Sequence, residues 1–259
     1  MKIPYYHVDA FTSTPFAGNP AGVCVLEAWL PDETMLGIAA ENNLSETAFL
    51  VESEGHYELR WFTPVTEVDL CGHATLASAH VVFRHLGHTS PVVRFESKSG
   101  TLRVAREEQI LVLDFPARPG ERCDAPAALV EGLGREPVET YRARDYMAVF
   151  GTQAEIEALA PDMALLKEVV SLGVIATAPG DEVDFVSRFF APTVGIPEDP
   201  VTGSAHCTLI PYWSARLGKQ VLHARQVSAR GGELYCQDAG ERVRIGGRAV
   251  TYLTGEIEL

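Results

Sequence analysis

Hydrophobic and polar positions alternate in short runs along most of the chain, which predicts many strands and few long helices. Runs typical of strands lie at residues 5–11, 22–26, 46–52, 57–63, 92–96, 101–106, 110–115, 137–143, 146–150, 173–178, 183–190, 221–228, 233–237, 243–245 and 250–258. Start signals and helical spacing predict helices over residues 31–43, 126–134 and 153–170.

Two further segments, residues 74–86 and 205–217, have hardly any polar stripe. A helix that is apolar on every side is buried and does not lie on a surface. In a chain rich in strands, each is best placed at the centre of a sheet that wraps around it. Pro211 lies inside the second segment, where its missing N–H predicts a kink.

These two segments are similar in sequence. They open with Gly72-His-Ala-Thr75 and Gly203-Ser-Ala-His206, and both close on Leu-Gly. Aromatic strands ending in proline precede them, Arg60-Trp-Phe-Thr-Pro64 and Arg188-Phe-Phe-Ala-Pro192. The offset of 131 residues between Gly72 and Gly203 indicates a duplicated unit, since it is far longer than a solenoid repeat. We expect the two helix starts to meet across a pseudo-two-fold interface and form one polar pocket between the halves.

The best linker candidate is Pro116-Ala-Arg-Pro-Gly120. It divides the chain into residues 1–116, to which a last strand over residues 249–259 returns, and residues 117–248.

Composition narrows the class of partner. A formal net charge of −14 argues against nucleic acid and against an anionic membrane surface. The start of the chain has no signal-peptide run, and no segment reaches a membrane-spanning length. Five cysteines without a Cys-x-x-Cys motif suggest free thiols in a reducing compartment, so a cytoplasmic location is expected.

The two helix starts are candidate anion sites, because unpaired backbone N–H groups there can bind a carboxylate. Ordinary capping is the alternative, with Asp199 as N-cap and Pro200 at the first helical position. The duplication favours anion binding. The sequence has no metal-ligand spacing, phosphate loop or dinucleotide fingerprint, so neither a metal nor a cofactor is expected.

Individual side chains give weaker signals. Glu46 begins an apolar strand, where a raised pKa would suit a general base, although a solvated glutamate is the commoner case. His73 is a candidate proton shuttle or an interface residue. Cys71 is either a thiol with a depressed pKa or a small buried residue. His80 and His206 are interpreted as core histidines.

Together these segments resemble a known family. The matching motifs are Asp9-Ala-Phe-Thr12, Phe16-Ala-Gly-Asn-Pro20, Asn43-Leu-Ser-Glu-Thr47, Asp69-Leu-Cys-Gly-His-Ala-Thr75, Glu198-Asp-Pro-Val-Thr-Gly-Ser204 and Gln226-Val-Ser-Ala-Arg-Gly-Gly232. They resemble the phenazine-biosynthesis isomerase (PhzF-like) family, within the diaminopimelate epimerase superfamily, nearly end to end. The resemblance implies an α+β fold of two similar halves, each a mostly antiparallel sheet rolled around one central helix, with the site in the cleft between them.

The resemblance also implies roles for single residues. Glu46 corresponds to the general acid/base, with His73 and Asp199 as its polar partners. The remaining implied contacts are backbone amides around Gly72 and His73 and around Gly203 and Ser204, which hold the substrate carboxylate, and Asn19 and Ser45, which line the pocket. The phenazine enzyme moves a proton within a dihydro-hydroxyanthranilate ring without cofactor or metal. The expected partner is thus a small anionic carboxylate substrate, and a homodimer is considered for the chain.

The epimerase branch uses two cysteines instead. Cys71 matches the first, whereas Asp199 stands where the second is expected, so a one-base proton shift around Glu46 is favoured. We therefore expect a cofactor-independent isomerase acting on a small carboxylate-bearing molecule. Two alternatives stay open: an amino-acid racemase or epimerase that uses Cys71 with Glu46, and a non-catalytic small-molecule- or partner-binding protein on the same fold.

Overall fold

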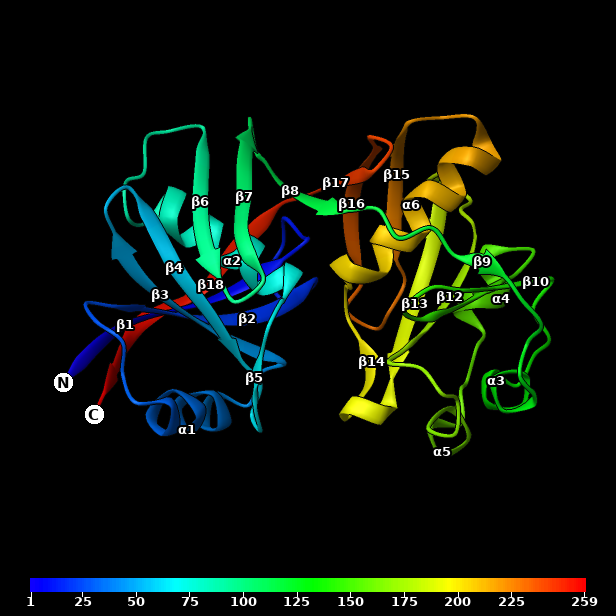
Figure 1. The fold of residues 1–259 in the computed structure, drawn as a ribbon, viewed down its shortest axis with the longest axis horizontal. Helices are drawn as coiled ribbons and strands as arrows, with labels where there is room; N and C mark the ends of the chain where they lie inside the picture. Colours follow the sequence, from blue (N-terminus) through cyan, green and yellow to red (C-terminus); the bar gives the residue numbers. More distant parts are fainter. The chain divides into compact units, whose positions relative to one another are not determined.

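The chain folds into two compact units in the computed structural model, which describes residues 1–259 (Figure 1). Unit 1 comprises Met1–Asp114 and Gly246–Leu259, and unit 2 comprises Phe115–Ile245. No helix combines the length and the apolar character needed to cross a bilayer.

Unit 1 is a rolled sheet with two helices. Its elements are β1 (Lys2–Ala10), β2 (Asn19–Leu26), α1 (Asp32–Asn42), β3 (Glu46–Ser53), β4 (His56–Phe62), β5 (Glu67–Val68), α2 (Gly72–Arg84), β6 (Val92–Ser97), β7 (Gly100–Glu107), β8 (Ile110–Pro116) and β18 (Ala249–Glu258). The strands pair in the order β18-β1-β2-β3-β4-β6-β7-β8. Only the β2–β3 and β4–β6 pairs are parallel.

Helix α2 is the core of unit 1 and packs against β1, β2, β3 and β18. From His73 to Phe83 every side chain except His80 is buried. The helix lacks a polar face because the sheet covers it on nearly all sides, as the apolar pattern predicts.

Unit 2 repeats this plan. Its elements are β9 (Glu121–Arg122), α3 (Ala127–Leu133), β10 (Glu139–Arg142), β11 (Tyr146–Val149), α4 (Gln153–Glu157), α5 (Met163–Leu166), β12 (Val174–Pro179), β13 (Phe185–Ala191), the 3-10 turn η1 (Pro192–Val194), β14 (Ile196–Asp199), α6 (Gly203–Leu217), β15 (Val221–Gln226), β16 (Gly232–Asp238) and β17 (Arg242–Gly247). The strands pair in the order β9-β10-β11-β12-β13-β15-β16, with parallel pairs β11–β12 and β13–β15. Helix α6 packs against β15 and β16 and is buried except for Ser204, Pro211, Tyr212 and its last three residues.

The two units also share a local detail. In unit 1, Arg60 on β4 forms a bidentate ion pair with Glu67 on β5, with N–O distances of 2.7 and 2.8 Å. In unit 2, Arg188 on β13 pairs in the same way with Glu198 on β14, at 2.7 and 2.9 Å. This correspondence, together with the matching strand order, confirms the predicted fold of two similar halves, each with one central helix.

Several predicted boundaries are wrong. The helix predicted over residues 153–170 is two short helices, α4 and α5, because Pro161 interrupts the pattern and Asp162 starts a new helix. The Asp162 carboxylate accepts hydrogen bonds from the N–H groups of Ala164 and Leu165. Helices α2 and α6 begin two residues earlier than predicted, and α6 continues through Pro211.

Buried histidines predict that the protein is sensitive to acid. His206 is fully buried in α6, and burial lowers its pKa to about 4. In the unfolded chain its pKa is about 6.5, so the unfolded state takes up the proton first as the pH falls. The contribution of His206 to stability is complete above about pH 6.5 and is lost as the pH falls from there toward 4.

His206→Asn tests this. His206 Nδ1 lies 2.8 Å from the carbonyl oxygen of Thr202, and asparagine keeps a donor near that position but does not titrate. We expect the melting temperature of the variant to fall less steeply than that of the wild type between pH 7 and pH 4.5. Parallel curves for the two proteins would contradict the assigned shift.

Candidate active site

Glu46 is the first residue of β3, and the parallel pairing of β2 with β3 sets its surroundings. The register places Glu46 beside Ala21, so the start of β2 at Asn19 lies at the same edge of the sheet. Asn19 is fully buried, and Ser45, which directly precedes β3, is half-buried. Three residues expected at the site, Asn19, Ser45 and Glu46, therefore lie at one edge of unit 1.

The start of α2 brings two more groups to Glu46. His73 Nε2 lies 3.3 Å from Glu46 Oε2, and the side chains are 7% and 12% exposed. On the other side of the ring, His73 Nδ1 lies 3.5 Å from the sulfur of Cys71, the N-cap residue of α2. The imidazole of His73 thus lies between a carboxylate and a thiol, both nearly withdrawn from water.

Burial decides the protonation state of His73. It lowers the pKa of His73 to about 3, so the ring is neutral near pH 7. A neutral imidazole has one N–H donor and one acceptor nitrogen. The Nδ1 contact with the Cys71 thiol fits either tautomer, and Nε2 faces Glu46 Oε2 at 3.3 Å without the geometry of a hydrogen bond.

The side chains of Glu46, Cys71 and His73 are also close enough together to bind a metal ion. Ligand atoms of Glu46, Cys71 and His73 lie within 4.8 Å of one another. Thiolate, imidazole and carboxylate are ligands that zinc accepts. Sequence spacing gives no sign of such a set, because Glu46 comes from a strand start and the other two from a helix start.

In unit 2, Asp199 ends β14 and is held by a buried network. Its Oδ2 accepts a hydrogen bond from the Thr202 hydroxyl at 2.5 Å. Gln226, which is 1% exposed, accepts from the Thr202 N–H at 2.9 Å and donates to the Asp199 carbonyl oxygen at 2.7 Å. This network fixes the backbone that leads into α6. Thr202 and Gln226 were not among the expected site residues, although both lie in the matching motifs.

The duplication also relates the N-cap positions of the two central helices. Cys71 is the N-cap of α2, and the N-cap of α6 is Thr202. Thr202 is therefore the residue that corresponds to Cys71 within the duplicated unit. Asp199 is also not an N-cap followed by a helical proline, because α6 begins only at Gly203. The second half still has no thiol at the corresponding position.

Ser204, in the first turn of α6, has a cationic neighbour that the sequence does not indicate. Arg144 donates to its hydroxyl at 2.9 Å and also contacts the Asp145 carboxylate at 3.2 Å. Asp145 is 2% exposed, and burial raises its pKa. Arg144 lies in a loop 60 residues before Ser204 in the sequence and belongs to no motif. The contact therefore becomes apparent only in the folded structure.

Comparison with known proteins extends these observations to the whole chain. Residues 8–255 match the family model described as phenazine biosynthesis-like protein, PhzC-PhzF. An uncharacterized isomerase of Pseudomonas aeruginosa is 53% identical over the full length of both chains. The crystal structure of a PhzF-family phenazine biosynthesis protein from Enterococcus faecalis superposes with a TM-score of 0.98, at 49% identity and complete coverage of both chains.

A more distant neighbour relates the fold to epimerases. The structure of a predicted epimerase from Pseudomonas aeruginosa superposes with a TM-score of 0.75 over 98% of this chain and 99% of its own, at 19% identity. That likeness concerns the fold alone. The family match over residues 8–255, the related isomerases and the duplicated fold lead to one conclusion: the chain belongs to the phenazine biosynthesis-like (PhzC-PhzF) family and is an isomerase.

Proposed function

We propose that this isomerase moves a proton between two carbon atoms of a small carboxylate-bearing substrate, with Glu46 as the single acid/base. The observation that carries the proposal is the contact of Glu46 with a neutral, buried His73. A proton shift needs a group that accepts a proton from carbon and then returns it. Glu46 takes the proton from one carbon, and the protonated carboxyl group delivers it to another, so no electrons are gained or lost.

His73 supports this role as a donor. We place its proton on Nε2, which lies 3.3 Å from the Glu46 carboxylate, so that a small shift on substrate binding would let the neutral ring donate to the base. A neutral donor can contact the carboxylate without placing a positive charge beside the base. The pKa of about 3 for His73 favours the neutral donor.

The same low pKa argues against a thiolate at Cys71. To activate the thiol, His73 Nδ1 would have to accept its proton and become a buried imidazolium ion, which burial disfavours. Cys71 therefore serves best as a donor that fixes the tautomer of His73.

Substrate binding is assigned to backbone groups at the helix starts. The helices begin at Gly72 and Gly203, and neither has a side-chain cap on its first N–H groups. Such groups, with the positive end of the helix dipole, bind carboxylates. Asp199 and Ser204, at the start of α6, are proposed to contact the substrate as well. Since backbone N–H groups would supply most of the binding, we expect Ser204→Ala to weaken substrate affinity by less than about tenfold in a titration.

An epimerase is the second candidate. It is favoured by the position of Cys71, whose sulfur lies within 4.8 Å of the Glu46 and His73 ligand atoms and could act as a second base. Product analysis distinguishes the two reactions. Candidate cyclic and amino-acid carboxylates are incubated with the enzyme in D2O and followed by NMR and chiral chromatography. We expect a product in which the C–H bond has moved to a different carbon. Inversion at the original carbon, with deuterium gained there, would replace our proposal by the epimerase.

A further inference from the structure

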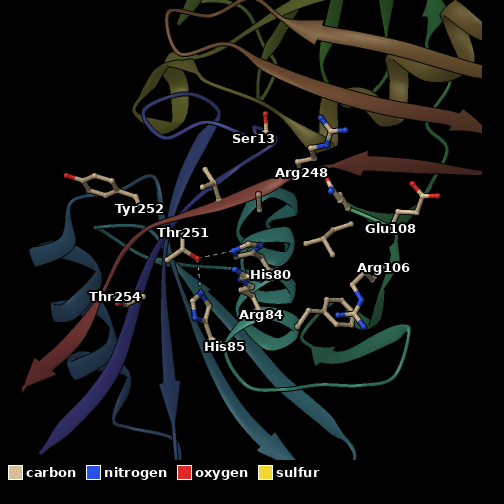
Figure 2. Close-up of a pocket in the computed structure, with 15 residues that line it drawn as sticks. Ser13, His80, Arg84, His85, Arg106, Glu108, Arg248, Thr251, Tyr252 and Thr254 are labelled. Atoms are coloured by element: carbon tan, nitrogen blue, oxygen red, sulfur yellow. Dashed lines mark hydrogen bonds between the residues drawn. The ribbon is translucent and has the colours of Figure 1, made fainter.

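A cavity of about 920 Å³ lies in unit 1 at the C-terminal end of α2. Its wall is formed by the last turn of α2, the β7–β8 turn and the first half of β18. Figure 2 shows His80 and His85 pointing toward Thr251, whose Oγ1 lies 2.9 Å from His80 Nε2 and 2.8 Å from His85 Nε2. The volume falls within the range of small-molecule sites, about 300–1,000 Å³.

This cavity is separate from the Glu46 site. His73 is in the first turn of α2, whereas Arg84 is its last residue. At 1.5 Å of rise per residue, the ends of this helix are about 18 Å apart. A molecule in the cavity would therefore not touch Glu46.

The lining carries excess positive charge. Its guanidinium groups belong to Arg84, Arg106 and Arg248, and its one carboxylate belongs to Glu108. Arg106 lies over the ring of Phe83 at 4.6 Å, and neither it nor Arg84 pairs with a carboxylate. In a chain with a net charge of −14, Arg84 and Arg106 give this cavity a local positive charge that can attract an anion.

Besides apolar residues such as Phe83 and Leu111, the lining has further groups that can hydrogen-bond to a polar ligand. Thr251, Thr254, Ser13 and Gln109 contribute hydroxyl and amide groups. Arginine forks bind phosphate and carboxylate oxygens with paired hydrogen bonds. The negative end of the α2 dipole opposes an anion here, but its half charge is smaller than that of the arginines.

From this arrangement we infer that the cavity binds a small polyanion, a phosphorylated or polycarboxylate metabolite, through Arg84 and Arg106. The inference goes beyond the reaction proposed at Glu46 and does not depend on it. It assigns the isomerase a second ligand site at the opposite end of the helix that carries His73.

Isothermal titration calorimetry with pyrophosphate and with citrate, at constant ionic strength, tests this site. We expect saturable binding to the wild type and about a 100-fold loss in the double variant Arg84→Gln/Arg106→Gln, since each charged hydrogen bond contributes about tenfold. Arg103→Gln is the matched control, because Arg103 lies on the same strand β7 as Arg106 but does not line the cavity. It should bind both anions like the wild type.

A second variant avoids any loss of packing. Thr254→Asp adds a carboxylate to the lining at an exposed position and should also weaken binding. Tighter binding of pyrophosphate than of citrate would assign phosphate chemistry, and the reverse would assign carboxylate chemistry. Absence of saturable binding by the wild type, or an equal loss in Arg103→Gln, would overturn the inference.

Discussion

Glu46→Gln is expected to lower turnover by about 10²- to 10⁴-fold while leaving substrate binding nearly intact. Glutamine keeps the shape of the side chain and can still contact His73, but it cannot take a proton from carbon. The loss should therefore appear in kcat and not in the affinity for substrate. Steady-state kinetics, together with calorimetric titration of the inactive variant, separates the two effects.

Cys71→Ala is the matched comparison, because the thiol lies on the other side of the same His73 ring. We expect it to reduce turnover by less than about tenfold, since it removes only a weak donor to Nδ1. If Cys71→Ala abolishes turnover and Glu46→Gln spares it, the one-base mechanism is wrong. A thiol-based epimerase would then be the better description of this enzyme.

Gly18→Ala is expected to destabilise the fold severely, by about 3 kcal/mol or more, or to prevent folding. Gly18 lies in the turn between β1 and β2 with φ +67°, a region that residues with a side chain rarely adopt. A Cβ atom there would also lie 2.1 Å from the carbonyl oxygen of Ala10. Since Ala10 pairs with Asn19, the clash would separate β1 from β2 at the edge where Asn19 lies.

Gly87→Ala separates the two causes. Gly87 has a similar φ of +72°, but a Cβ atom there would meet nothing within 4 Å. We expect it to cost only about 1–2 kcal/mol, the penalty of the left-handed conformation. Urea denaturation of both variants measures the difference. Equal losses would mean that the clash with Ala10 is relieved without cost.

The sequence predicts the duplicated fold because the features that indicate it lie within short segments of the chain. A helix with no polar side must be buried, and the two glycine-led helices and the strands before them carry this evidence within short segments. Glu46 and His73 were also selected from the sequence, but only through the resemblance to a family. The composition of their surroundings would not have singled out either residue.

The shortest strands cannot be predicted from the pattern of apolar and polar residues. Strand β5 has two residues and β14 has four, too few for a periodic pattern, yet each places the glutamate that pairs with Arg60 or Arg188. The backbone before α6 is likewise held by the hydrogen-bond network of Asp199, Thr202 and Gln226, which no local rule reveals.

The sequence by itself determined the family and the two-half architecture, since both depend on motifs whose residues are close together in the chain, and Glu46 became the acid/base candidate through the family resemblance. The tertiary structure decided which groups meet. The parallel register of β2 and β3 and the start of α2 bring His73 between Glu46 and Cys71. Pairing of β18 with β1 carries Thr251 to His80, 171 residues away in the chain. Contacts between distant residues, and the pKa values set by their burial, arise only when the sheets close around their helices.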